Sequence, residues 1–129
     1  MGDPKSDTEQ SVPLCYSVSE KNQMLVVSFT GDLNSQVLAS LEVCREEVMR
    51  KSKATNVVLF FQQVESMSTE VVSWLAQMQR EIRMKPAELR ICGLRTNMKE
   101  RLVKMGIIRG MELADDLKTA LLSFERLNG

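Results

Sequence analysis

The chain has 129 residues, with 17 basic and 17 acidic side chains and no histidine. This length predicts one domain with a single core, and a content of 43% hydrophobic residues is ordinary for a globular protein. The zero net charge and the 5% aromatic content argue against nucleic-acid binding, which uses basic patches and stacking rings. Without histidine, Ser-His-Asp triads, Cys-His dyads and the commonest zinc sites are excluded.

The three cysteines, Cys15, Cys44 and Cys92, are widely spaced and odd in number. This pattern disfavours a disulfide framework or a metal site and predicts a cytoplasmic protein with buried thiols. No apolar run approaches the roughly 18 residues that a membrane span requires, so direct membrane insertion is not expected.

Residues 1–13 read as a flexible N-terminal tail, and residues 14–127 as the folded domain. Residues 14–19 alternate weakly and predict an edge strand, while residues 24–30 predict a second strand that forms a hairpin with it. The polar stretch at 31–35 is expected to break this second strand.

A helix is predicted over Gln36–Lys51, because its apolar residues recur at intervals of four, three and four positions. These residues are Val37, Leu41, Cys44 and Val48. Asn34 or Ser35 has the side chain to cap this helix.

The centre of the chain combines a buried strand at 56–61 with a polar connection and an amphipathic helix. The connection ends in hydroxyl residues, of which Ser68 is placed to cap the helix, while Glu70 complements its positive end. The buried stripe of the helix is formed by Val71, Leu75, Met78 and Ile82, with Trp74 beside it in the core.

In the remaining part of the chain, strands alternate with helices. They are a strand at 89–94, a helix from Thr96 or Asn97 that Gly106 ends, a short strand at 111–113, and a helix from Asp115 or Asp116. Asn97 and Glu100 have the spacing of a capping box. The whole order, β-β-α-β-α-β-α-β-α, predicts an α/β fold with a mixed sheet and covering helices.

Three local patterns in this order resemble the STAS domain, the fold of bacterial anti-sigma factor antagonists. Residues 24–34, which end in Gly31-Asp32-Leu33-Asn34, resemble the family's strand closing in Gly-Glu-Leu-Asp. Residues 57–72 resemble its central strand and the loop Met-Asp-Ser-Ser/Thr-Gly-Leu. Residues 91–107 resemble its late strand and the helix that ends in a Gly-Leu/Ile pair. The resemblance covers about residues 14–127 and implies a single STAS-like domain.

In that family a kinase phosphorylates a loop serine or threonine and thereby releases the partner. Counted without gaps, Ser68 stands at the family's aspartate, Thr69 at the first hydroxyl, Glu70 at the phosphoacceptor and Val71 at the glycine. Glu70 is then a fixed, partial mimic of the phosphorylated state, since one carboxylate has less charge than phosphate. A shift of one residue instead makes Thr69 the acceptor, with Ser68 before it. A purely structural reading, in which Ser68 caps the helix and Glu70 complements it, accounts equally for these residue types.

The resemblance implies a non-catalytic protein-interaction module that binds an anti-sigma factor or related regulatory kinase and carries a degenerate switch, with Thr69 as the surviving hydroxyl. The expected partner-binding residues are Asp32, Asn34, Ser35, Ser66, Met67, Ser68, Thr69, Glu70 and Val71. The alternative is a constitutive STAS subunit of a larger assembly, such as a membrane lipid-transport ATPase. An enzyme is disfavoured, because no motif places its carboxylates for catalysis, and no cofactor is expected, because a Gly-rich phosphate loop is missing.

Overall fold

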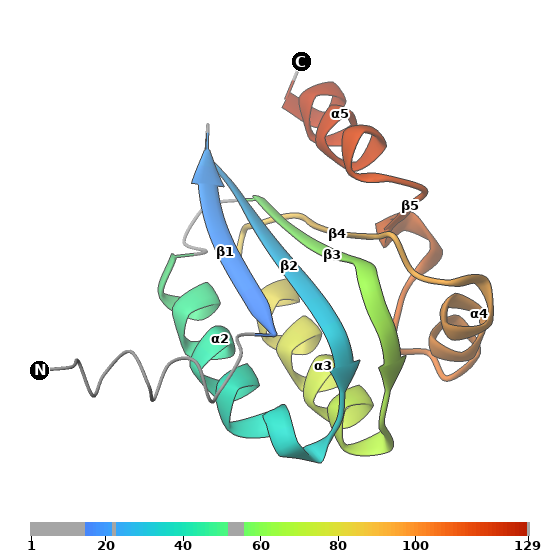
Figure 1. The fold of residues 1–129 in the computed structure, drawn as a ribbon. Helices are drawn as coiled ribbons and strands as arrows, with labels where there is room; N and C mark the ends of the chain where they lie inside the picture. The colour runs from blue at the N-terminus through green and yellow to red at the C-terminus, as the bar shows by residue number, and fades with distance from the viewer. Residues whose placement is uncertain (1–14, 22, 52–55, 129) are drawn as a thin grey trace, which may run out of the picture.

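The computed structural model describes residues 15–21, 23–51 and 56–128 (Figure 1). The elements, in chain order, are β1 (Tyr16–Lys21), β2 (Met24–Leu33), η1 (Ser35–Val37), α2 (Leu38–Lys51), β3 (Asn56–Met67), α3 (Thr69–Arg83), β4 (Leu89–Cys92), α4 (Thr96–Lys104), η2 (Gly110–Glu112), β5 (Leu113–Ala114) and α5 (Leu117–Asn128). This order confirms the predicted alternation of strands and helices. The predicted tail at 1–13 lies outside the described residues.

The five strands form one mixed sheet in the order β1-β2-β3-β4-β5. β1 runs antiparallel to β2, whereas β2, β3, β4 and β5 are parallel to one another. The hairpin between β1 and β2 turns at Gln23, which has a φ of 64°. The parallel connections place the carboxyl ends of β2, β3 and β4 at the same edge of the sheet.

The central strand β3 is buried on both faces, which explains its unbroken apolar run. Val57, Leu59 and Phe61 belong to the main core cluster, which includes buried residues of α2 and α3. Val58 instead packs with Phe124 of α5 in a second cluster. Figure 1 shows the matching arrangement, with α2 and α3 side by side and α5 apart from them.

Aromatic rings hold the middle of the main core. The ring of Phe29 stacks on that of Phe61 with centroids 4.9 Å apart, and Trp74 meets Phe29 edge-on at 5.9 Å. Trp74 is 5% exposed, so the prediction of a core role for this residue is confirmed.

Two predicted strand ends were wrong, because β2 and β3 each continue further along the chain. β2 runs through the expected break to Leu33, and β3 runs through the expected connection to Met67. The extensions pair with each other from Thr30 opposite Gln63 to Leu33 opposite Met67, with one register shift just before Thr30 and a second between Gly31 and Asp32. Their polar side chains are exposed, and a half-exposed strand with bulges loses the alternation by which a strand is recognised.

The elements after β4 differ from the sequence-based prediction in two places. The capping box predicted at Asn97 and Glu100 was wrong, since α4 begins at Thr96 and its N-cap is Arg95, which lies two residues before Asn97 and makes no capping side-chain bond. The strand predicted at 111–113 is mostly the turn η2, with β5 formed by Leu113 and Ala114. Gly106 does end α4, with a φ of +77° and its N–H donating to the Val103 carbonyl.

Candidate functional site

The carboxyl ends of β2 and β3 bring two of the predicted segments together. Asp32 lies opposite Ser66 in the ladder, and Leu33 lies opposite Met67. The backbone N–H of Ser68 then donates to the Leu33 carbonyl at 2.8 Å, which fixes the start of α3 against the end of β2. Residues more than thirty positions apart in sequence therefore share one edge of the sheet.

Asp32 and Ser66 are joined by a hydrogen bond in which the Ser66 hydroxyl donates to Asp32 Oδ1 at 2.9 Å. Both side chains are exposed. The hydrogen bond fixes the direction of a hydroxyl and a carboxylate at the surface, and polar groups held in this way lose little entropy when they bind.

Ser68 is the N-cap of α3, as the sequence predicted. Its φ and ψ of −76° and 168° are extended, and its Oγ accepts a hydrogen bond from the backbone N–H of Val71 at 3.3 Å. The Ser68 side chain is half-buried and its hydroxyl is already used by the helix. Its role here is to set the position of the residues that follow it.

Thr69 and Glu70 occupy the first turn of α3, and both side chains are exposed. Thr69 is therefore the accessible hydroxyl of this turn. Glu70 is the acidic residue of the turn, where a carboxylate stabilises the positive end of the helix dipole.

Two of the residues expected to bind a partner have buried side chains. Val71 is 0% exposed and Met67 is 6% exposed, and both belong to the main core cluster. Met67 ends a strand with its side chain turned inward, and Val71 begins the buried stripe of α3. These two side chains lie in the core beneath the surface and are not themselves accessible.

Asn34 and Ser35 lie at the turn that follows β2. Asn34 is the N-cap of η1, and its Oδ1 accepts a hydrogen bond from the backbone N–H of Gln36 at 2.9 Å, as predicted for a capping residue. Ser35 is exposed at the first position of the turn. Both residues follow Leu33 directly, so they extend the same edge of the sheet.

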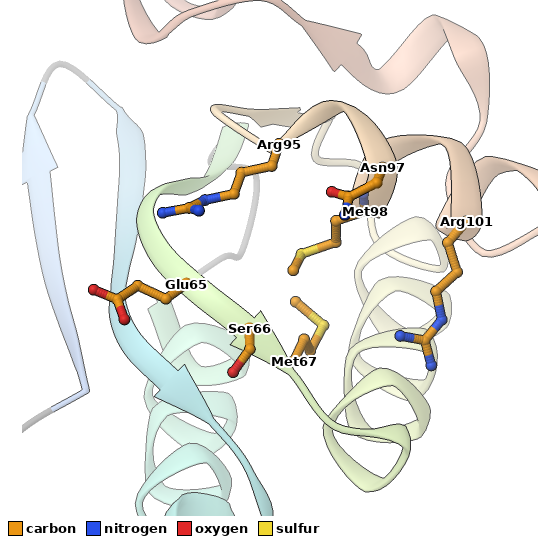
Figure 2. A pocket seen from close by; sticks show the side chains of 7 residues that line it. All are labelled: Glu65, Ser66, Met67, Arg95, Asn97, Met98 and Arg101. Atoms are coloured by element: carbon orange, nitrogen blue, oxygen red, sulfur yellow. The ribbon is translucent and has the colours of Figure 1, made fainter.

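Sequence reasoning assigned no role to α4, whose residues form the far wall of a cavity beside this edge (Figure 2). The cavity has a volume of about 270 Å³ and lies between the end of β3, with Ser66 and Met67, and the α4 residues Arg95, Asn97 and Arg101. The signal that points to it is topological, because ligands of parallel sheets bind outside the carboxyl ends of the strands.

The three cysteines are buried, as predicted. Burial raises the pKa of the Cys44 and Cys92 thiols to about 12 and also raises that of Cys15. A thiol with a raised pKa holds little of the reactive thiolate at neutral pH, so these side chains act as small hydrophobic groups.

The part of the chain that the structure describes holds no cluster of three or more cysteine or acidic side chains suited to a metal ion. Within the same residues, none of the helices has the length and apolar character that crossing a membrane demands.

Solved structures with the same fold include two forms of SpoIIAA and one of RsbS. SpoIIAA, the Bacillus cell fate determinant, in its phosphorylated form has a TM-score of 0.67 and 12% identity, over 87% of this chain and 98% of that one. The anti-sigma factor antagonist SpoIIAA in its unphosphorylated form gives 0.66 and 12%, over 88% and 98%. A serine-to-glutamate variant of RsbS from Moorella thermoacetica gives 0.69 and 20%, over 88% and 97%.

Comparison of the sequence with curated proteins finds no match. The STAS domain family, by contrast, matches the sequence over residues 16–120, from the first strand to the first turn of α5. This match covers most of the chain and confirms the resemblance drawn from the three local patterns. The chain belongs to the STAS domain family.

Proposed function

We propose that this protein is a non-catalytic interaction module of the anti-sigma factor antagonist kind, which binds an anti-sigma factor or related regulatory kinase in the cytoplasm. Its fold is that of SpoIIAA, which is described as an anti-sigma factor antagonist, and of RsbS. The partner surface, called here the switch face, is formed by the exposed or half-exposed residues Asp32, Asn34, Ser35, Ser66, Ser68, Thr69 and Glu70.

The observation that carries this proposal is the junction of β2 with β3 and α3. The Ser66–Asp32 hydrogen bond and the backbone bond from Ser68 to Leu33 fix this junction, and exposed polar groups surround it. A preorganised surface of this kind loses little entropy when a partner binds.

The switch itself is degenerate in this proposal. Glu70 holds the usual acceptor position and presents one permanent negative charge, whereas the Ser68 hydroxyl caps the helix. Thr69 remains as the exposed hydroxyl for a kinase, and phosphate there adds roughly −1.5 to −2 charges beside Glu70. Added charge at the centre of the switch face weakens the complex through like-charge repulsion and desolvation.

The test compares Thr69→Asp with the wild-type chain by isothermal titration against the anti-sigma factors of the same organism, each expressed and purified. We expect one of them to bind the wild-type chain, and Thr69→Asp to weaken that binding at least tenfold. The matched control is Gln77→Asp, which adds the same charge at an exposed position two turns further along α3 and should leave the affinity within twofold. Equal affinities for wild type and Thr69→Asp would remove Thr69 from the interface.

A second candidate function is a constitutive subunit of a larger assembly, such as a membrane lipid-transport ATPase. The exposed Glu70 favours it, since a permanent subunit has no need of a phosphoacceptor at that position. The single variant Glu70→Ser separates the two functions, because it restores a hydroxyl without removing the buried Val71 side chain. Phosphorylation of Glu70→Ser by the partner kinase supports the switch, whereas an unmodified loop favours the permanent subunit.

A further inference from the structure

A second cleft lies at the opposite end of the sheet from the switch face, beside the start of β4. It has a volume of about 310 Å³ and is enclosed by the end of α3, the first residues of β4 and the turn η2. A volume of this size is at the lower end of the range that is usual for ligand sites, which begins at about 300 Å³.

The cleft is positively charged, although the whole chain has no net charge. Four basic and two acidic side chains line it, which leaves a net charge of +2. Both acidic side chains, those of Glu88 and Glu112, already form ion pairs with an arginine of the cleft. The remaining cations are Lys85 and Arg109, and neither forms an ion pair with a carboxylate of the described residues.

The edge of the sheet is open beside this cleft. β4 pairs with β3 along all four of its residues, but with β5 only at the last two. The Val57 N–H donates to the Glu88 carbonyl, so the backbone groups of the next residue, Leu89, point away from β3 and toward the cleft. The Leu89 carbonyl accepts from the side chain of Arg90 at 2.8 Å, where a neighbouring strand would otherwise donate.

The turn η2 is the reason that β5 leaves this edge open. In the register of β5, Met111 would lie opposite Leu89, but it belongs to the turn instead. Met111 lines the cleft and is 77% exposed, which is unusual for a large apolar side chain. An open edge beside an exposed methionine offers an extended chain both backbone pairing and an adaptable apolar contact.

We propose that this cleft binds an acidic, extended peptide segment of a partner protein, which adds to the sheet beside Leu89 and places its carboxylates near Lys85 and Arg109. The open edge favours a peptide, because an extended backbone pairs with a strand whatever its side chains are. The two unpaired cations favour acidic side chains in that peptide. A single-stranded nucleic acid fits less well, since no aromatic side chain lines the cleft for base stacking. This inference does not depend on the proposed partner of the switch face.

The experiment is a ¹⁵N–¹H NMR titration of the full chain with the capped peptide Glu-Val-Glu-Val-Glu. We expect saturable shifts of the backbone amides at 88–90 and 109–112, with a Kd in the millimolar range or below. The uncharged peptide Gln-Val-Gln-Val-Gln should bind roughly fivefold more weakly, because it lacks the carboxylates. The acidic peptide with a methyl group on every backbone nitrogen keeps the charges but has no N–H donors, and it should also bind roughly fivefold more weakly.

The double variant Lys85→Gln with Arg109→Gln should weaken binding of the acidic peptide roughly fivefold, because it removes both unpaired cations. The matched control is Arg80→Gln with Lys104→Gln, which removes two exposed cations outside the cleft and should bind as the wild-type chain does. Lys85→Gln alone serves if the double variant does not fold, as judged by its amide spectrum. Three results would each overturn the proposal: no saturable shift with the acidic peptide, equal affinity for its methylated form, or unchanged affinity in the folded cleft variants.

Discussion

At the scale of single residues, the switch face depends on a capping bond that positions its hydroxyls. Ser68 accepts from the Val71 N–H, and this bond sets where α3 begins and so where Thr69 and Glu70 emerge. Ser68 thus stabilises the start of the helix, and the exposed residues Thr69 and Glu70 that follow it carry the surface chemistry.

Ser68→Ala removes this cap and should lower the free energy of unfolding by about 1 kcal/mol, the usual cost of losing an N-cap hydroxyl. Urea denaturation followed by circular dichroism measures the change. The control is Ser73→Ala, an exposed serine inside the same helix, where alanine has the better helix propensity and no loss is expected. Equal stability of Ser68→Ala and the wild-type chain would mean that the bond contributes nothing.

The helix caps of the switch face could be predicted from the sequence, but the exposure of every side chain expected there could not. The caps at Asn34 and Ser68 could be predicted because each side chain accepts a hydrogen bond from a backbone N–H two or three residues further along the chain. The burial of Met67 depends on a tertiary contact of β3, and the Asp32–Ser66 bond depends on the register between two strands. Such relations have no local signature.

At the scale of elements, a buried ion pair ties the end of α3 to the turn η2. Arg83 donates through Nε and Nη2 to the two carboxylate oxygens of Glu112 at 2.8 and 2.7 Å, and Nη2 also donates to the Ile107 carbonyl. Glu112 is 6% exposed, so its charge depends on this partner.

Burial acts to raise the pKa of Glu112, but the hydrogen bonds from Arg83 and from the Arg109 backbone outweigh it and leave the pKa below its usual 4.5. Because the folded pKa is the lower one, the unfolded chain takes up its proton first as the pH falls. The stabilisation is therefore complete above about pH 4.5 and is lost as the pH falls through the folded pKa.

Glu112→Gln should cost about 3 kcal/mol at neutral pH, since it leaves the Arg83 charge without its partner. It should also flatten the dependence of stability on pH below about 4.5, the usual pKa of this carboxyl. Urea denaturation at neutral and acidic pH measures both effects. The control is Glu100→Gln, an exposed glutamate of α4, which should behave as the wild-type chain does. An unchanged slope below pH 4.5 in Glu112→Gln would contradict this account.

The turn from β4 into α4 is a second point at which elements are held together. Gly93 has a φ of +81°, and a Cβ at this position would lie 2.7 Å from the backbone nitrogen of Gln62. The close contact sets α4, and with it Arg95, against β3.

Gly93→Ala should destabilise the fold by about 2 kcal/mol or more, because backbone strain adds to a clash with a strand that cannot move aside. Gly106→Ala is the matched control, since its φ is also positive, at +77°, but no atom lies within 4 Å of the added Cβ. Thermal denaturation should give the larger loss at Gly93. An equal loss of stability in the two variants would show that the close contact with Gln62 does not contribute to the effect.

The long elements could be predicted because their periodicity is strong, whereas the extensions of β2 and β3 could not. Residues 62–67 are mainly polar and form a strand only because β2 offers unpaired backbone groups alongside. Backbone pairing of this kind does not depend on side-chain type. The sequence alone therefore predicted a connection at these residues.

At the scale of the whole molecule, α2, α3 and α5 pack on the sheet, whereas its carboxyl edge is where we propose that a partner binds. α2 and α3 share the main core, and Phe124 of α5 closes the second cluster on Val58. The switch face and the arginine-lined cavity both lie at this edge, and Ser66 belongs to both. The order of strands and helices along the chain could be predicted, whereas the placement of α4 at the edge required the three-dimensional structure.

The most direct measurement is purification of the tagged chain from its own cells, with wild type, Thr69→Asp and Gln77→Asp in parallel, and quantification of the bound proteins by mass spectrometry. The account predicts that an ATP-binding anti-sigma factor or related kinase is enriched with wild type and Gln77→Asp and is lost with Thr69→Asp. Recovery of membrane-transporter subunits in place of a kinase, or equal recovery of the kinase with all three chains, would contradict it.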